Sequence, residues 1–192
     1  MKYAGQEYYE IDVAGIKRLL PIVPISDSLW IAAFVLLGDV ELTNGCARAL
    51  AARLQSFQFD CVVSIEAKAL PLVHMIATYL SDPVTGRYFP YVVLRKSVKG
   101  YMKNPLTAEV KSITTASVQS LVLDGPDADR IRGKRVAVVD DVVSTGGSLR
   151  ATEEILERAG ARVVARATVL LEEAGYQNPA LISLGTLPIF TR

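Results

Sequence analysis

Short apolar runs alternate with amphipathic segments along most of the chain. The runs are rich in valine, isoleucine and leucine, as in buried strands, and the segments between them repeat apolar residues at the spacing of one helix face. The predicted strands are residues 59–65, 91–95, 135–143 and 161–171, and the predicted helices are residues 42–57, about 70–80 and a segment that starts after residue 144 and ends at Gly160. Strand, helix and strand in this order predict an α/β fold, with a mostly parallel sheet flanked by helices.

The sequence also predicts how two of these helices begin or end. Thr43 or Asn44 is expected to cap the helix at 42–57. Gly160 is expected in the C′ position of the last helix, where glycine accepts a left-handed backbone. One face of that helix is expected to be buried, namely Leu149, Thr152, Ile155, Leu156 and Ala159.

The remaining segments lack a helical period. Pro21 and Pro24 predict irregular structure or short strands within the first 28 residues. Residues 96–107 are predicted to be a mobile loop, because they contain glycine and proline and no apolar repeat. Residues 108–124 alternate as an antiparallel hairpin does, and the following DGPDAD is predicted to be a turn.

Length and composition narrow the class of protein. The 192 residues suffice for one domain, with a small N-terminal hood (about 1–40), a core (41–175) and a C-terminal segment (176–192). With 51% hydrophobic and 21% charged residues the chain is not disordered, and a net charge of +1 gives no reason to expect a nucleic acid or membrane partner. The apolar run at 29–38 is about half the ~20 residues that a membrane span needs. No secretory signal pattern opens the chain, so we expect a cytoplasmic protein.

Isolated reactive side chains are expected to be structural. Cys46 and Cys61 have no metal-ligand spacing and are expected to be buried small side chains. His74 is expected to pack within the apolar face of the helix at 70–80. Trp30, in the apolar run, is expected in the core.

The strongest chemical signal lies at residues 136–154. Asp140 and Asp141 end the most strand-like run of the chain, at the end of a strand where open α/β sheets bind ligands. The next residues, 144–148 (STGGS), lead directly into a helix. Their glycines let several backbone N–H groups converge at a helix N-terminus. The segment therefore predicts an anion site beside carboxylates that can take ribose hydroxyls or a divalent cation.

Two other interpretations of this segment are weaker. A phosphate-binding P-loop is excluded, because Arg135 follows Gly133-Lys134 where serine or threonine belongs. A polar turn that merely caps the next helix would explain an isolated TGGS, but not one that stands in register with a strand, two aspartates and a helix.

The segment VVDDVVSTGGS resembles the phosphoribosyl-pyrophosphate signature of the type I phosphoribosyltransferases, and the resemblance extends over most of residues 20–190. Residues 62–77 (VVSIEAKALPLVHMIA) are similar to the pyrophosphate-loop segment of adenine phosphoribosyltransferases. Residues 91–101 (YVVLRKSVKGY) are similar to their strand that ends in Arg-Lys before a mobile loop. The resemblance therefore implies an adenine-like or xanthine-like member of the purine branch, active in purine salvage.

The resemblance also implies roles for particular residues. Asp140 and Asp141 would hold the ribose 2′- and 3′-hydroxyls, directly or through Mg²⁺, the implied cofactor. The 5′-phosphate would be bound by Ser144, Thr145, Gly146, Gly147 and Ser148. The pyrophosphate would be bound by Glu66, Ala67, Lys68 and Ala69, with lysine at position 68 where the family usually has arginine.

The implied catalytic residues are Lys68, Arg95 and Lys96, whose positive charge would stabilise the departing pyrophosphate. Lys96 would act across the interface of a homodimer. The base-binding candidates are Val142, beside the signature, and Ile25 and Leu29 near the N-terminus, where adenine enzymes have a Phe-Arg-Asp motif.

The resemblance favours adenine as the base. Ser144 stands where hypoxanthine–guanine members have an aspartate, although the loop lacks the Glu-Tyr pattern of adenine enzymes. Two alternatives stay open: a phosphoribosyltransferase for another base (xanthine, hypoxanthine/guanine, orotate or uracil), and a regulator that binds phosphoribosyl pyrophosphate without turnover. A regulator would be expected to carry a nucleic-acid-binding element or a basic surplus, and the sequence has neither signal.

Overall fold

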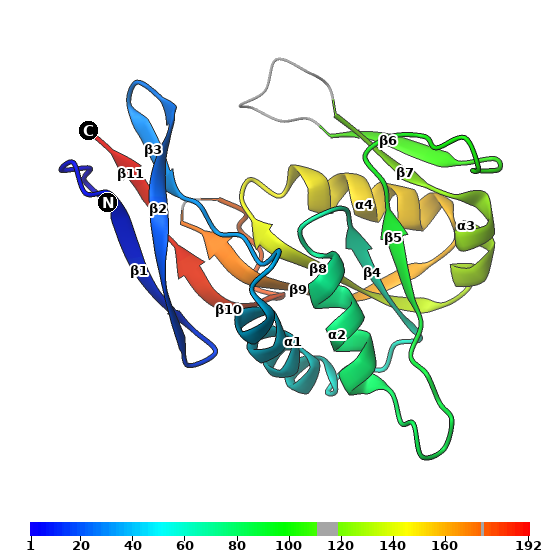
Figure 1. Ribbon diagram of the computed structural model, residues 1–192. Helices are drawn as coiled ribbons and strands as arrows, with labels where there is room; N and C mark the ends of the chain where they lie inside the picture. Colours follow the sequence, from blue (N-terminus) through cyan, green and yellow to red (C-terminus); the bar gives the residue numbers. More distant parts are fainter. Residues whose placement is uncertain (111–118, 174) are drawn as a thin grey trace.

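A parallel five-stranded sheet forms the centre of the computed structural model, which describes residues 1–110, 119–173 and 175–192 (Figure 1). In spatial order its strands are β10 (Leu181–Leu187), β9 (Arg162–Glu172), β8 (Arg135–Val143), β4 (Cys61–Ile65) and β5 (Tyr91–Leu94). The predicted α/β class is confirmed, and β8 has the predicted bounds.

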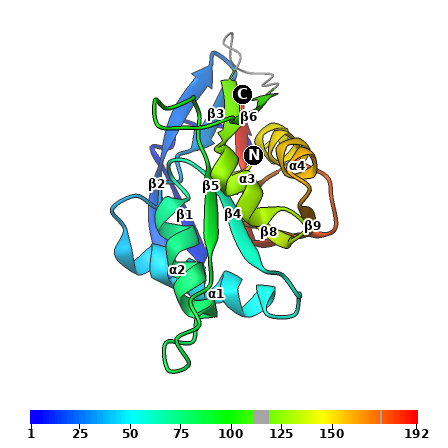
Figure 2. The same cartoon turned by 90° about the vertical axis from the view of Figure 1, so that its right-hand side faces the viewer.

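Helices cover both faces of this sheet. Ala137 and Val139 of β8 pack on the side of α1 (Val40–Leu54) and α2 (Leu70–Leu80), while Val136 and Val138 pack on the side of α3 (Gly125–Ile131) and α4 (Gly147–Arg158). Figure 2 shows α1 and α2 on one side of β8 and α4 on the other. Because β8 is buried on both faces, its sequence is a continuous apolar run and does not alternate.

A second, antiparallel sheet forms the hood. Its strands, in order, are β1 (Tyr8–Val13), β2 (Ile16–Ser26), β3 (Leu29–Ala32) and β11 (Ile189–Thr191). The prediction of irregular structure or short strands was wrong for β2, an 11-residue strand that contains both prolines. A proline cannot donate to a ladder but can accept. The Pro21 carbonyl accepts the Ala33 N–H, and Pro24 lies beside a register shift.

Two local predictions need correction. The cap of α1 is Asp39, whose side chain accepts the Leu42 N–H at 3.0 Å. The predicted caps, Thr43 and Asn44, lie within the helix, and the Thr43 hydroxyl donates to the Leu36 carbonyl. The segment predicted as a turn, residues 124–129, forms the cap and first part of α3, which has Pro126 in its first turn, where the missing N–H costs nothing.

Two other predictions are confirmed. Helix α4 ends with Gly160 in the left-handed region (φ 76°), and its five predicted face residues are buried. The hairpin consists of β6 (Leu106–Val110) and β7 (Gln119–Leu123), and its connection, residues 111–118, lies outside the described residues.

Three side chains outside the site also bear on function. Both cysteines are buried, and burial raises the pKa of the Cys46 thiol to about 12 and that of Cys61 to about 11, so neither is an activated nucleophile. His74 was predicted to be packed but is exposed on α2, with its ring edge-on to that of Tyr91. In the described ranges no helix is both long and apolar enough to cross a bilayer.

Candidate active site

The strand order places the site at the middle of the sheet. Strands β4 and β8 are neighbours at the middle of the sheet. After β4 the chain adds β5 on one side of this pair, and after β8 it adds β9 and β10 on the other side. Open α/β sheets bind ligands at the carboxyl ends of strands at such a switch point. Glu66 directly follows β4, and Asp140 and Asp141 lie near the carboxyl end of β8. Topology therefore brings together the two segments that the sequence singled out.

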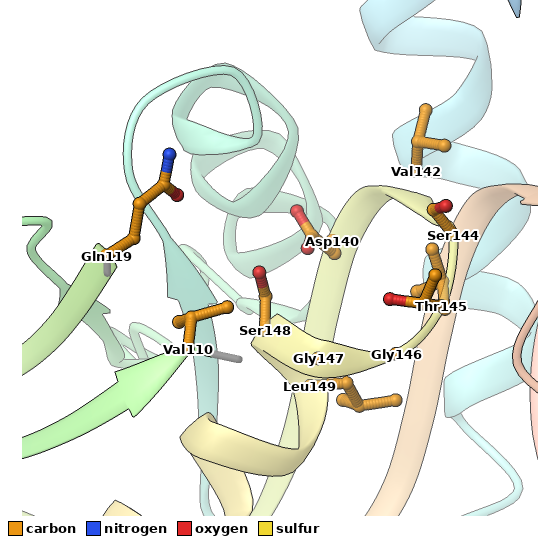
Figure 3. Close-up of a pocket in the computed structure, with 11 residues that line it drawn as sticks. Val110, Gln119, Asp140, Val142, Ser144, Thr145, Gly146, Gly147, Ser148 and Leu149 are labelled. Atoms are coloured by element: carbon orange, nitrogen blue, oxygen red, sulfur yellow. The ribbon is translucent and has the colours of Figure 1, made fainter. Parts of the chain in front are cut away.

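A cavity of about 210 Å³ opens beside the end of β8 (Figure 3). Its lining residues are Val110, Gln119, Asp140, Val142, Val143, Ser144, Thr145, Gly146, Gly147, Ser148 and Leu149. Asp140, Thr145 and Ser148 point toward one another, with Gln119 and Val110 on the opposite wall. The predicted anion loop and the predicted ribose carboxylate thus share one cavity.

The loop at residues 144–148 has the backbone of an anion site. Gly146 caps α4 with a left-handed backbone (φ 77°), and α4 begins at Gly147. Among the described residues no acceptor is found for the backbone N–H groups of residues 145–148. Unpaired N–H groups at the positive end of a helix dipole favour a bound anion.

Tyr176, which the sequence analysis missed, supports this loop from behind. Its N–H donates to the Ser144 carbonyl at 2.7 Å, and its ring lies so close to Gly146 that an added Cβ would be 2.2 Å from Cδ2. Asn178 Nδ2 donates to the Tyr176 hydroxyl at 3.0 Å. No motif marks Tyr176, because it follows β9 and reaches the loop only through the fold.

The two aspartates lie in different surroundings. Asp140 is half-buried in the cavity wall, and burial together with the neighbouring Asp141 charge raises the pKa of its carboxyl well above its usual value. Asp141 is 4% exposed, and its Oδ2 lies 2.8 Å from Lys68 Nζ. Within the described residues this oxygen has no hydrogen bond of good angular geometry. In this structure Lys68 therefore pairs with Asp141.

The donor set fits Mg²⁺ held jointly by protein and substrate. Among the described residues no three His, Cys, Asp or Glu side chains are grouped so as to hold a metal alone. Mg²⁺, however, is commonly bound by one or two carboxylates together with substrate phosphates. Asp140 suits such a site, because a carboxyl whose pKa is raised is stabilised in its charged form by a nearby cation.

Four residues at the ends of β4 and β5 form what we call the Glu66 cluster: Glu66, Arg95, Lys96 and Tyr101. Glu66 Oε1 accepts the Lys96 N–H at 2.6 Å, its Oε2 pairs with Arg95 Nε, and Arg95 Nη1 donates to the Tyr101 hydroxyl at 3.0 Å. Burial alone would raise the pKa of Glu66, but the Lys96 N–H and the Arg95 guanidinium outweigh it, so the pKa lies below its usual value.

The other predicted site residues are placed as follows. Ala67 and Lys68 are exposed between β4 and α2, Ala69 is buried at the start of α2, and the Lys96 side chain is exposed. Ile25 (47% exposed) and Leu29 lie in the hood and do not line the 210 Å³ cavity, so their role in base binding stays a prediction. Two further residues that the sequence missed, Val110 and Gln119, enter the cavity wall from the hairpin.

Comparison with known families identifies the class. The family described as "Phosphoribosyl transferase domain" matches residues 40–182, most of the chain. The chain therefore belongs to the phosphoribosyltransferase family, as the signature at the end of β8 predicted.

Individual relatives divide by base. The chain is 36% identical over 133 residues to a hypoxanthine/guanine phosphoribosyltransferase of Methanothrix soehngenii, and the match covers 69% of the chain and 62% of that enzyme. It is 28% identical to an adenine phosphoribosyltransferase of Petrotoga mobilis, with 88% and 90% covered. The crystal structure of adenine phosphoribosyltransferase from Thermoanaerobacter pseudethanolicus shares the fold, with a TM-score of 0.64, 24% identity and 94% and 95% coverage.

Proposed function

We propose that the protein transfers the 5-phosphoribosyl group from phosphoribosyl pyrophosphate to a purine base, giving a nucleoside monophosphate and pyrophosphate. A bond forms between ribose C1 and a ring nitrogen of the base, the C1–O bond to pyrophosphate breaks, and the base releases its ring proton to solvent water. The observation that carries the proposal is the shared cavity of Asp140 and the 144–148 loop. It offers a hydroxyl acceptor beside an anion site, as a sugar phosphate requires.

The chain's own residues divide the work. The N–H groups of residues 145–148 and the hydroxyls of Thr145 and Ser148 bind the 5′-phosphate, and Asp140 accepts hydrogen bonds from the ribose hydroxyls. Lys68 and Lys96 bring positive charge to the departing pyrophosphate, on which negative charge grows as the C1–O bond breaks. The same groups bind the ground state less strongly than the transition state, which is what accelerates the reaction.

Mg²⁺ is the proposed cofactor. Asp140 would contribute to its binding, with the remaining ligands supplied by the substrate and water. When bound, the ion would neutralise charge on the pyrophosphate. Asp141 is proposed to position Lys68, because its buried carboxylate Oδ2 lies 2.8 Å from Lys68 Nζ.

The proposed base is adenine, on the resemblance of the pyrophosphate loop and of Ser144. A second candidate is hypoxanthine or guanine, because relatives at 36% identity bear those names. The walls of the base site are proposed to include Val142, with Ile25 and Leu29 of the hood.

We also propose that the protein is a homodimer that pairs through α1 and α2. Val40 is 80% and Tyr88 is 74% exposed, and two adjoining cavities of about 390 and 340 Å³, both lined by His74, connect them across α2. Exposed apolar side chains beside such cavities favour association. Light scattering should give twice the chain mass, and Val40→Asp should shift it toward the monomer, whereas Leu19→Asp on the hood should not.

One assay tests the proposed function. The protein is incubated with Mg²⁺ and phosphoribosyl pyrophosphate against adenine, hypoxanthine, guanine, xanthine, uracil and orotate, and pyrophosphate release is followed. We expect release with a purine and none with uracil or orotate. Binding of phosphoribosyl pyrophosphate without release for any base would support the regulator instead. Absence of both would overturn the proposal. Location in the cytoplasm stays a prediction of the sequence.

A further inference from the structure

We infer that Glu66 is a positioning residue for Lys96, and not itself a ligand of the pyrophosphate. The inference rests on the proposed function, and it changes the role that the resemblance implies for Glu66. Both carboxylate oxygens are already engaged within the chain, one by the Lys96 N–H and the other by Arg95 Nε. The side chain is 14% exposed, so it has little surface left for a ligand.

Charge points to the same conclusion. Glu66 is ionised at neutral pH, since its pKa lies below the usual value, and a carboxylate repels a pyrophosphate. Its charge is useful where it is: it holds the guanidinium of Arg95 and the backbone of Lys96 in one place. Charge-assisted hydrogen bonds of this kind are short and directional.

Arg95 extends the connection to two other segments. Its backbone N–H and carbonyl both bond Val122 of β7 at 2.8 Å, and its Nη1 donates to the Tyr101 hydroxyl in the following loop. Arg95 is therefore occupied on its Nε and one of its Nη groups. Lys96 directly follows these attachments and its side chain is exposed, so its ammonium is the cation of this pair that is available to a substrate.

The division of labour makes a kinetic prediction. If Glu66 acts through Lys96, then Glu66→Gln should lower kcat by about 10²-fold, the loss expected from a misplacement of about 1 Å, with little change in KM. In Lys96→Ala the same Glu66→Gln change should have almost no further effect. A residue that binds pyrophosphate independently would multiply its loss with that of Lys96→Ala.

Three controls complete the design. Glu153→Gln removes a comparable carboxylate–arginine pair, Glu153 with Arg166 Nε, and should leave kcat unchanged. Tyr101→Phe removes only the hydroxyl of a 63% exposed side chain, so it should fold normally and give a smaller loss, which should also vanish in Lys96→Ala. The melting temperature of each variant separates lost positioning from lost folding.

Trypsin supplies a measurement that does not depend on activity. Cleavage after Lys96, Lys99 or Lys103 should be several-fold faster in Glu66→Gln than in the native protein, and unchanged in Glu153→Gln. Multiplied kinetic losses together with unchanged cleavage would overturn the inference. A native protein that turns over no base, but whose loop is cut faster in Glu66→Gln, would overturn the proposed function and leave the positioning role supported.

Discussion

The 144–148 loop and the Glu66 cluster lie at the ends of neighbouring strands, but different interactions hold them. The loop is shaped by backbone geometry: a left-handed Gly146, a helix that begins at the next residue and the ring of Tyr176 behind it. The cluster is shaped by charge, because Glu66 draws Arg95 and the Lys96 backbone together. Under the proposed function, the rigid loop suits a phosphate that stays in place, and the charged cluster places a cation beside the departing pyrophosphate.

The largest effect on substrate binding is expected from a change in the backbone geometry of the 144–148 loop. In Gly146→Ala the left-handed backbone costs about 1–2 kcal/mol, and the new Cβ would lie 2.2 Å from the Tyr176 ring. We expect affinity for phosphoribosyl pyrophosphate, measured by titration calorimetry, to fall by about 10²-fold, or about 2.7 kcal/mol. Gly133→Ala is the matched control: φ is 71° but no atom lies within 4 Å of the added Cβ, so it should lose stability and keep affinity. Equal affinities in the two variants would contradict the assignment of the loop.

A change in the Glu66 cluster should lower the reaction rate more than it weakens substrate binding. We expect Lys96→Ala to lower kcat by about 10²-fold and to change KM by less than about threefold, because in the proposed function its charge stabilises the departing pyrophosphate. Steady-state kinetics with varied phosphoribosyl pyrophosphate measure both constants. Lys103→Ala, a second exposed lysine of the same loop, should be neutral. A rise in KM at constant kcat would show that Lys96 only binds substrate.

Gly147→Ala separates an anion site from a simple helix cap. Gly147 is the first residue of α4 and has no positive φ, so alanine should stabilise the helix by up to about 1 kcal/mol. A methyl group there would nevertheless crowd a phosphate that approaches the backbone closely, and we expect the ligand-induced rise in melting temperature to shrink. A Gly147→Ala variant that keeps the full ligand-induced rise in melting temperature would contradict the phosphate-site hypothesis.

The smallest effect is expected at Asp39, which lies outside the site and stabilises the fold both as a helix cap and through its charge. Asp39 caps α1, and hydrogen bonding to Arg18 holds the pKa of its carboxyl below its usual value. A lowered folded-state pKa stabilises the protein above the unfolded pKa, and this stability is lost as the pH falls through the folded one. Asp39→Ala should cost about 1 kcal/mol at neutral pH.

Urea unfolding at several pH values measures this effect. Asp39→Asn keeps a capping oxygen and should lose only the pH-dependent part. If the two variants behave alike at every pH, the cap contributes nothing beyond the charge.

Local sequence patterns were sufficient to predict those elements whose structure depends on residues that are neighbours in the sequence. Strand β8 and helix α2 have the predicted bounds, and Gly160 ends α4 as predicted, because burial on both faces, helical periodicity and a left-handed glycine are properties of short segments. The predictions for β2 and the cap of α1 were wrong for the opposite reason. Whether Pro21 suits a strand depends on the partner that its carbonyl finds, and Asp39 is favoured as the cap by Arg18 of the hood.

The α/β class and the position of the glycine-rich loop after Asp140 and Asp141 follow from the sequence alone, because each depends on patterns within short continuous segments. Contacts between segments across the sheet depend on the tertiary structure. It paired Asp141 with Lys68, placed Tyr176 behind Gly146 and joined Glu66 to Arg95. These contacts connect residues 29 to 73 positions apart, and such pairs come together only because parallel strands that are distant in sequence end at the same edge of one sheet.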